Sequence, residues 1–158
     1  MRSFFISLLA AAFAFAAHAQ ETPRDIVDAL FDGMRSGDGE AVRDVVADQA
    51  PLMRVEADGS VRPSTFDGWA DWVDVQNAGD ADEQIFDVSV NEHGNLASVW
   101  APFILHYKGE LAGCGVNQFT LARAKDSWVI IHGIDTQDGG DCSTFKARYG
   151  ERASTKAE

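Results

Sequence analysis

Three long apolar stretches in the second half of the chain constrain its fold most strongly. They are LASVWAPFILHY (96–107), LAGCGVNQFTLARA (111–124) and SWVIIHGIDTQ (127–137), and all are rich in β-branched and aromatic residues. The turn sequences Lys108-Gly109 and Lys125-Asp126 separate them. Runs of this composition bounded by turn residues are typical of strands joined as hairpins. The second half therefore predicts an antiparallel meander of long strands.

Helical patterns dominate the first half. Thr22-Pro23 is typical of a helix start, and apolar residues recur at helical spacing until the break at 36–39. A second helix is predicted near 39–47, and a third opens at the capping sequence Ser64-Thr65-Phe66-Asp67. Between them, Asp58-Gly59 predicts a tight hairpin. Three N-terminal helices packed in a curved antiparallel β-sheet predict an α+β fold shaped as a cone-like barrel.

The N-terminus has the pattern of a secretory signal peptide. A basic Arg2 precedes an apolar run over 4–17, and Ala17-His18-Ala19 is a small-x-small cleavage sequence, which places the cut before Gln20. The apolar run is shorter than the ~20 residues that a membrane span needs. We therefore expect a signal peptide over 1–19, one domain over 20–142, a C-terminal tail over 143–158, and a location in the periplasm or outside the cell, with no membrane span.

Charge and cysteine content narrow the function classes. The chain carries 25 acidic against 13 basic residues, a formal charge of −12, which repels phosphate backbones and argues against nucleic-acid binding. An exported protein with two cysteines predicts a disulfide between Cys114 and Cys142, and a buried or reactive free thiol is the alternative. The histidines lack the spacing of metal ligands, so neither a metal site nor a cofactor is expected.

The order of elements, with ASVWAPF, GCGVNQFTLAR and SWVIIHGIDT, resembles the nuclear transport factor 2-like superfamily. Within it, the chain looks like the secreted bacterial SnoaL-like and lumazine-binding-like members. The resemblance covers residues 22–138 and implies a pocket between the helices and the concave sheet face, often in a homodimer. The superfamily holds isomerases, dehydratases, polyketide cyclases and ligand carriers, so the fold does not settle the function.

Alternation along the strands predicts which residues face that pocket. Gly113, Gly115, Asn117 and Phe119 share one face of their strand, and Cys114 lies on the other. Continuing the same alternation from Trp128 puts His132 on the pocket face and Asp135 on the opposite one. We therefore expect glycines that leave room in the pocket and a polar pair at its mouth. The predicted ligand-binding residues are Trp69, Trp72, Asn117, Phe119, Trp128 and His132.

Three functions are compatible with this pattern. The first is an exported protein that binds a small apolar or aromatic molecule, and the second is a cofactor-free isomerase, dehydratase or cyclase with His132 as acid or base. The third is an accessory subunit that binds a partner protein. Both faces of the 96–107 strand are apolar, which predicts that a second subunit covers the face away from the helices, although Trp100 could lie on either face. Structural roles compete throughout: Asn117 and His132 could simply fix strand ends, and Trp69 and Trp72 could be core residues.

Overall fold

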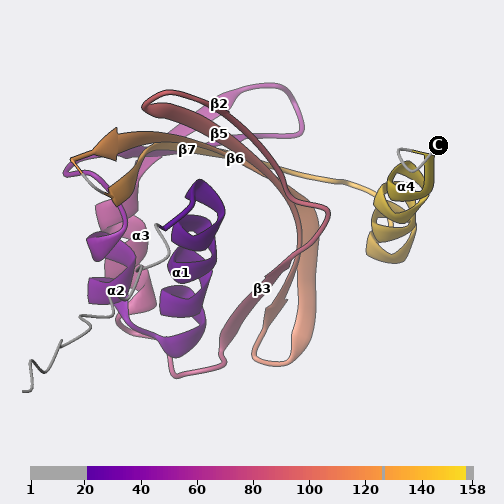
Figure 1. Cartoon of the computed structure of the whole chain (residues 1–158). Helices are drawn as coiled ribbons and strands as arrows, with labels where there is room; N and C mark the ends of the chain where they lie inside the picture. Colours follow the sequence, from indigo (N-terminus) through magenta and orange to yellow (C-terminus); the bar gives the residue numbers. More distant parts are fainter. Residues whose placement is uncertain (1–20, 126, 156–158) are drawn as a thin grey trace, which may run out of the picture.

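Three helices fill the concave side of a strongly curved sheet, and a fourth lies on the convex side (Figure 1). The computed structural model describes residues 21–125 and 127–155, so the predicted signal peptide lies outside the described residues. No helix in the described ranges is long and apolar enough to span a membrane. The elements are α1 (Pro23–Ser36), α2 (Gly39–Asp44), β1 (Pro51–Val55), β2 (Val61–Thr65), α3 (Phe66–Val73), β3 (Ala81–Ile85), β4 (Ser89–His93), β5 (Leu96–Tyr107), β6 (Glu110–Ala124), β7 (Ser127–Gln137) and α4 (Cys142–Thr155).

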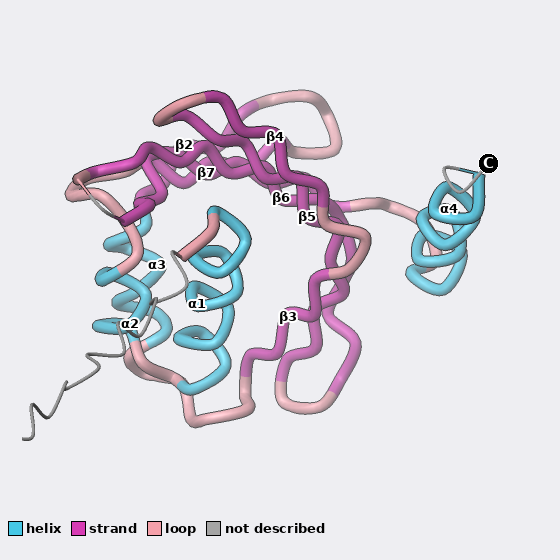
Figure 2. Tube along the Cα trace, in the orientation of Figure 1, coloured by secondary structure: helices cyan, strands magenta, loops and turns pink. Residues whose placement is uncertain are grey.

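The sheet has the order β2-β1-β7-β6-β5-β3 (Figure 2). The strand β4 pairs with residues 96–100 of β5, and β3 pairs with residues 103–107 of the same strand. Every pairing is antiparallel except that of β1 with β7, which is parallel. The three long strands β5, β6 and β7 form the predicted meander. The predicted α+β class, with N-terminal helices inside a curved sheet, is confirmed.

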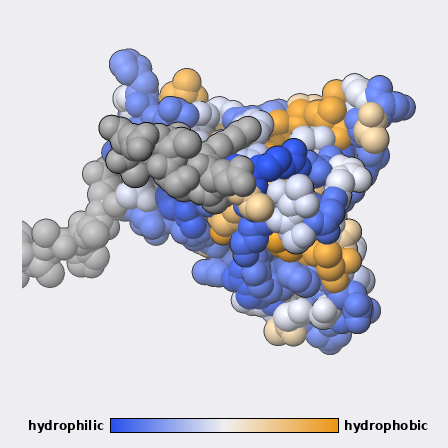
Figure 3. Space-filling model, turned by 90° about the vertical axis from the view of Figure 1, so that its right-hand side faces the viewer, coloured by the Kyte–Doolittle hydropathy of each residue, from blue (hydrophilic) through white to orange (hydrophobic). Residues whose placement is uncertain are grey.

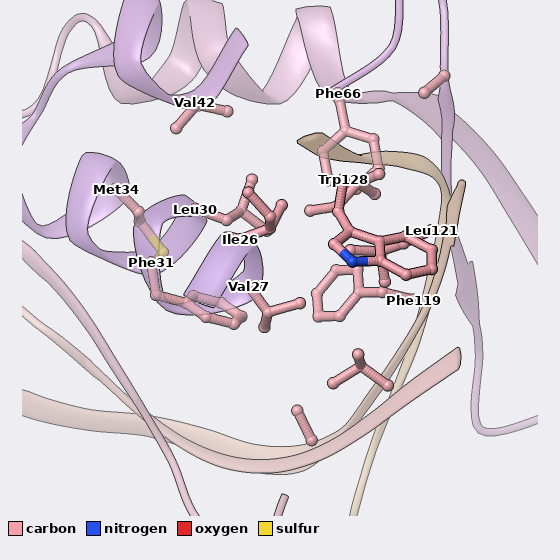
Figure 4. Close-up of a cluster of buried hydrophobic side chains, with 14 of the residues drawn as sticks. Ile26, Val27, Leu30, Phe31, Met34, Val42, Phe66, Phe119, Leu121 and Trp128 are labelled. Atoms are coloured by element: carbon pink, nitrogen blue, oxygen red, sulfur yellow. The ribbon is translucent and has the colours of Figure 1, made fainter. Parts of the chain in front are cut away.

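The helices begin where the sequence predicts, for identifiable reasons. Thr22 and Asp25 form a capping box at the start of α1, and Gly37 ends that helix in the left-handed conformation. Thr65, and not Ser64, caps α3 by accepting a hydrogen bond from the Gly68 amide. The buried faces of α1 and α3 meet Phe119, Leu121 and Trp128 from the sheet, as Figure 4 shows.

The segment 84–92, which alternates like one strand, is divided in the structure. Asp87 adopts a positive φ of 45° between β3 and β4 and so interrupts the ladder along β5. The interruption sends neighbouring side chains to different places. Phe86 packs with the cluster under α4, and Val88 packs against the main core. The alternation of apolar residues over 84–92 indicates one shared face, but Phe86 and Val88 lie in different clusters.

The convex face is covered in part by the chain's own C-terminus. Residues 143–158 are predicted as a tail, but α4 occupies Cys142–Thr155. The predicted disulfide between Cys114 and Cys142 is confirmed, with the two Cα atoms 5.6 Å apart. It attaches α4 to the outer side of β6, where Phe145 packs with both cysteines. The convex face is therefore covered at this point without any second subunit.

Further along the convex face, apolar side chains remain uncovered. Trp100 pairs with Gln118 on the outer side of the sheet and is 45% exposed. Leu96, on the same side of β5, is also exposed. The side of the molecule that bears α4 shows separate hydrophobic patches among hydrophilic side chains (Figure 3).

Gly115 allows two strands to approach each other closely. A Cβ atom there would lie 2.1 Å from the Thr136 carbonyl oxygen and 2.9 Å from the Gln137 Cα. A side chain at this position would force the two strands apart. At Gly113, by contrast, the nearest atom would be 3.7 Å away. The expectation that both glycines leave room in the pocket is therefore wrong for Gly115, whose missing side chain serves backbone packing.

Candidate functional site

Two adjoining cavities open between the helices and the concave face of the sheet. The outer one has a volume of about 460 Å³ and the inner one about 90 Å³. Together they offer room for a small ring system, since pockets for small ligands are of this order. The residues that line both cavities are Leu52, Arg54, Trp69, Glu83 and Asp135.

Aromatic side chains form the apolar wall of the inner cavity. Phe66 lies edge to face with Trp69, at 6.2 Å between ring centroids, and 6.4 Å from Phe119. Phe31 from α1 meets Phe119 edge to face at 6.0 Å. Gly133 makes this packing possible, because a Cβ atom there would lie 2.6 Å from the Phe66 ring. These rings offer a flat apolar ligand both faces and edges to pack against.

Opposite this wall, adjacent strands bring polar side chains together. In the sheet register Arg54 on β1 is next to Asp135 on β7, which is in turn paired with Asn117 on β6. The Arg54 Nε donates hydrogen bonds to both Asp135 carboxylate oxygens, at 2.8 and 3.0 Å, and Nη2 donates to Oδ2. Such bidentate pairs are the strong kind of ion pair. The pKa of Arg54 is raised by this hydrogen bonding to Asp135.

Glu83, on the edge strand β3, completes the polar group. The Asn117 Nδ2 donates to its Oε1 at 2.6 Å, and both side chains are buried. Burial, with a smaller contribution from the Asp135 charge, raises the pKa of Glu83 to about 7, against the lowering effects of the Asn117 hydrogen bond and the Arg54 charge. A carboxyl group with this pKa can hold or release a proton near neutral pH.

Four of the six predicted ligand-binding residues line these cavities. Trp69 and Trp72 line the outer one, and Trp69, Asn117 and Phe119 line the inner one. Trp128 is instead buried in the main core, beneath the Arg123 guanidinium at 4.6 Å from its ring centroid.

His132 lies on the opposite side of the sheet from Asn117. It pairs with Thr120, whose side chain points away from the face that carries Phe119. The reason is a β-bulge: Thr120 pairs with His132, but the next residue, Leu121, pairs with Ile130, so Ile131 is an extra residue. The expected polar pair of Asn117 and His132 is therefore wrong, and the isomerase hypothesis loses its acid or base at this position.

The same bulge brings Asp135 into the cavity, although alternation places it outside. Arg54 and Glu83 had no signal of their own in the sequence, because each lies in a strand of only five residues, too short for alternation to assign its faces. An inward Asn117 on a long core strand was the one usable clue, since a buried amide needs a polar partner. Among residues 21–125 and 127–155, no three His, Cys, Asp or Glu side chains gather closely enough to hold a metal ion.

Comparison with known proteins agrees with this architecture. The family model described as "Putative lumazine-binding" matches residues 18–133. The chain belongs to this family. No curated protein matches the chain.

Solved structures similar to this family member share its fold. A nuclear transport factor 2-like protein of unknown function from Shewanella baltica is 18% identical, with a TM-score of 0.57 over 74% of this chain and 91% of that one. A nuclear transport factor 2-like protein with a cystatin-like fold from Novosphingobium aromaticivorans is 15% identical, with a TM-score of 0.60 over 76% and 82%. A function-unknown protein from Mycobacterium tuberculosis is 15% identical, with a TM-score of 0.59 over 73% of each chain. The predicted superfamily is confirmed, and these likenesses establish the fold alone.

Proposed function

We propose that this protein binds a small, largely apolar or aromatic molecule in the two adjoining cavities. The observation that carries the proposal is the pairing of an aromatic wall with a polar group at one end. Phe66, Trp69 and Phe119 supply the wall, and Glu83 and Asn117 supply hydrogen-bonding groups deep inside. Apolar pockets with a few converging polar groups are the usual form of small-molecule sites.

The family description makes lumazine, a fluorescent bicyclic pteridine, a suitable first probe. The test is a fluorescence titration of lumazine with the wild-type protein and with two tryptophan variants. Trp69→Ala removes a ring that lines both cavities, and Trp100→Ala removes an exposed ring from the convex face. Loss of one buried aromatic contact should weaken binding about tenfold or more.

The proposal requires the two variants to differ. Trp69→Ala should weaken lumazine binding while Trp100→Ala leaves the affinity unchanged. Equal affinities for all three proteins would place the probe outside the cavities. Undetectable binding to the wild-type protein would exclude lumazine as ligand and direct the search to other aromatic molecules that co-purify with the protein.

We further infer that the protein is exported and forms a homodimer through the convex face. The signal-peptide pattern of the N-terminus, the Cys114–Cys142 disulfide and the exposed Trp100 and Leu96 support this inference. Native mass spectrometry of the protein purified from the periplasm would measure the subunit number, the cleavage site and any bound mass. A monomer that keeps the leader in front of Gln20 would contradict both export and dimer formation. A complex with a different protein would support the accessory-subunit alternative.

A further inference from the structure

Glu83 has one carboxyl oxygen available to a ligand. Its Oε1 accepts the hydrogen bond from Asn117, whereas no donor in the described part of the chain reaches its Oε2. Glu83 is one of the residues that line both cavities. A proton on the carboxyl group therefore belongs on Oε2, because Oε1 is already an acceptor.

The groups around Glu83 favour its neutral form. Asp135 on β7 faces it with a negative charge, which Arg54 on β1 partly compensates. On the helix side, Arg35 donates to the Glu83 main-chain carbonyl at 3.4 Å, and its charge is matched by Asp32 and Asp82. Its β5 neighbour in the register, Leu105, is apolar. Burial and the Asp135 charge therefore act in the same direction, against ionisation of Glu83.

Among the described residues that line the two cavities, neither arginine offers an unmatched positive charge to an anion. Two hydrogen-bonding nitrogens of the Arg54 guanidinium already contact Asp135, and Arg62 in the outer cavity pairs with Glu56 at 2.7 Å. A cationic ligand would in turn need an ionised Glu83, since the Asp135 charge is matched by Arg54. The charges of this site therefore favour a neutral ligand.

We propose, building on the proposed function, that Glu83 determines which ligands the cavities accept. As a neutral carboxylic acid it donates a hydrogen bond from Oε2 to a neutral, planar ligand whose buried edge carries a carbonyl or ring-nitrogen acceptor. Asn117 holds the carboxyl group in place by donating to Oε1. The aromatic wall then packs against the ring of the ligand.

The experiment uses three probes of similar size and different charge: acetophenone, benzoate and benzylammonium. Dissociation constants are measured by ligand-observed NMR at about pH 5.5 and about pH 8.5, where benzoate and benzylammonium keep their charges. Acetophenone should bind best. Its affinity should fall about 30-fold at the higher pH, because its carbonyl can only accept a hydrogen bond and a pKa of about 7 leaves only a few per cent of Glu83 protonated there.

Glu83→Gln provides the decisive variant, and Glu110→Gln at the exposed start of β6 is its matched control. A glutamine donates permanently from the same position and still accepts from Asn117, so acetophenone should bind E83Q with equal affinity at both pH values. The E110Q protein should keep the 30-fold change of the wild type. The three-probe comparison on the wild type needs no variant, so the inference stays testable if E83Q does not fold.

Two sets of results would overturn the inference. Preferred binding of benzoate or benzylammonium, or an E83Q protein with the pH dependence of the wild type, would overturn the role of Glu83 while leaving the cavity as a binding site. Failure of all three probes at both pH values would instead count against the proposed function itself, and the inference would fall with it.

Discussion

Replacing Glu83 by glutamine should make the folded protein more stable at alkaline pH. Glu83 is buried, and its pKa is raised from 4.5 to about 7. Below pH 4.5 the folded and unfolded chains both hold the proton. Between pH 4.5 and about 7 the unfolded chain releases it first, so the folded state loses stability as the pH rises; above about pH 7 the loss is complete.

The expected size of this effect follows from the same shift. At about 1.4 kcal/mol for each pH unit, moving the pKa from 4.5 to about 7 costs the folded state about 3 kcal/mol at alkaline pH. About 2 kcal/mol of this loss falls between pH 5.5 and 8.5, and the rest at lower pH. Glutamine cannot ionise, so the E83Q protein avoids the loss.

The measurement is the free energy of unfolding from urea titrations of wild type, E83Q and E110Q at about pH 5.5 and about pH 8.5, with the disulfide intact. The difference between E83Q and wild type should grow by about 2 kcal/mol at the higher pH, whereas E110Q should follow the wild type at both. A constant difference between E83Q and wild type would refute the assignment of a raised pKa to Glu83.

Three further changes test other parts of the structure. Gly115→Ala should cost about 3 kcal/mol of unfolding free energy, because its Cβ would lie 2.1 Å from a carbonyl oxygen, while Gly113→Ala should cost far less; equal costs would contradict the close approach. Arg54→Met should cost about 3–5 kcal/mol by leaving Asp135 buried and unpaired, and R54M combined with D135L should be more stable than R54M alone, as urea titrations would show. Reduction of the disulfide, whose cysteines are 28 positions apart, should lower stability by about 3.5 kcal/mol on the chain-entropy estimate, and an unchanged melting temperature in reductant would contradict this.

The fold was largely predictable because its signals are local and repeated. The segments 96–107, 111–124 and 127–137 are long runs rich in apolar residues, and turn residues separate them. The helix α1 has a complete capping box at its N-terminus. The disulfide was predictable from the signal-peptide pattern and the presence of two cysteines. The helix α4 was missed because residues 142–155 have a weak amphipathic pattern and a polar composition.

The site was less predictable because it depends on register. Trp69, Asn117 and Phe119 were found from periodicity, since each continues a regular pattern within its own element. Alternation assigned His132 and Asp135 to the wrong faces of the sheet, because no sequence signal marks the bulge at Ile131. The partnership of Asn117 with Glu83 joins strands that are not neighbours in the sheet, and single-strand patterns hold no information about such pairs.

The bulge in β7 makes the charge of the cavity depend on the register of the strand as well as on its composition. Deleting Ile131 would leave every later residue on its present face, because His132 would still pair with Thr120, whereas pairing Ile131 itself with Thr120 would turn the remainder of the strand over. His132 and Ile134 would then face the helices, and Asp135 would move to the convex face, away from Arg54. Loss of the bulge by such a slip in register would thus convert an acidic, ion-paired cavity floor into one with an imidazole and an unpaired guanidinium.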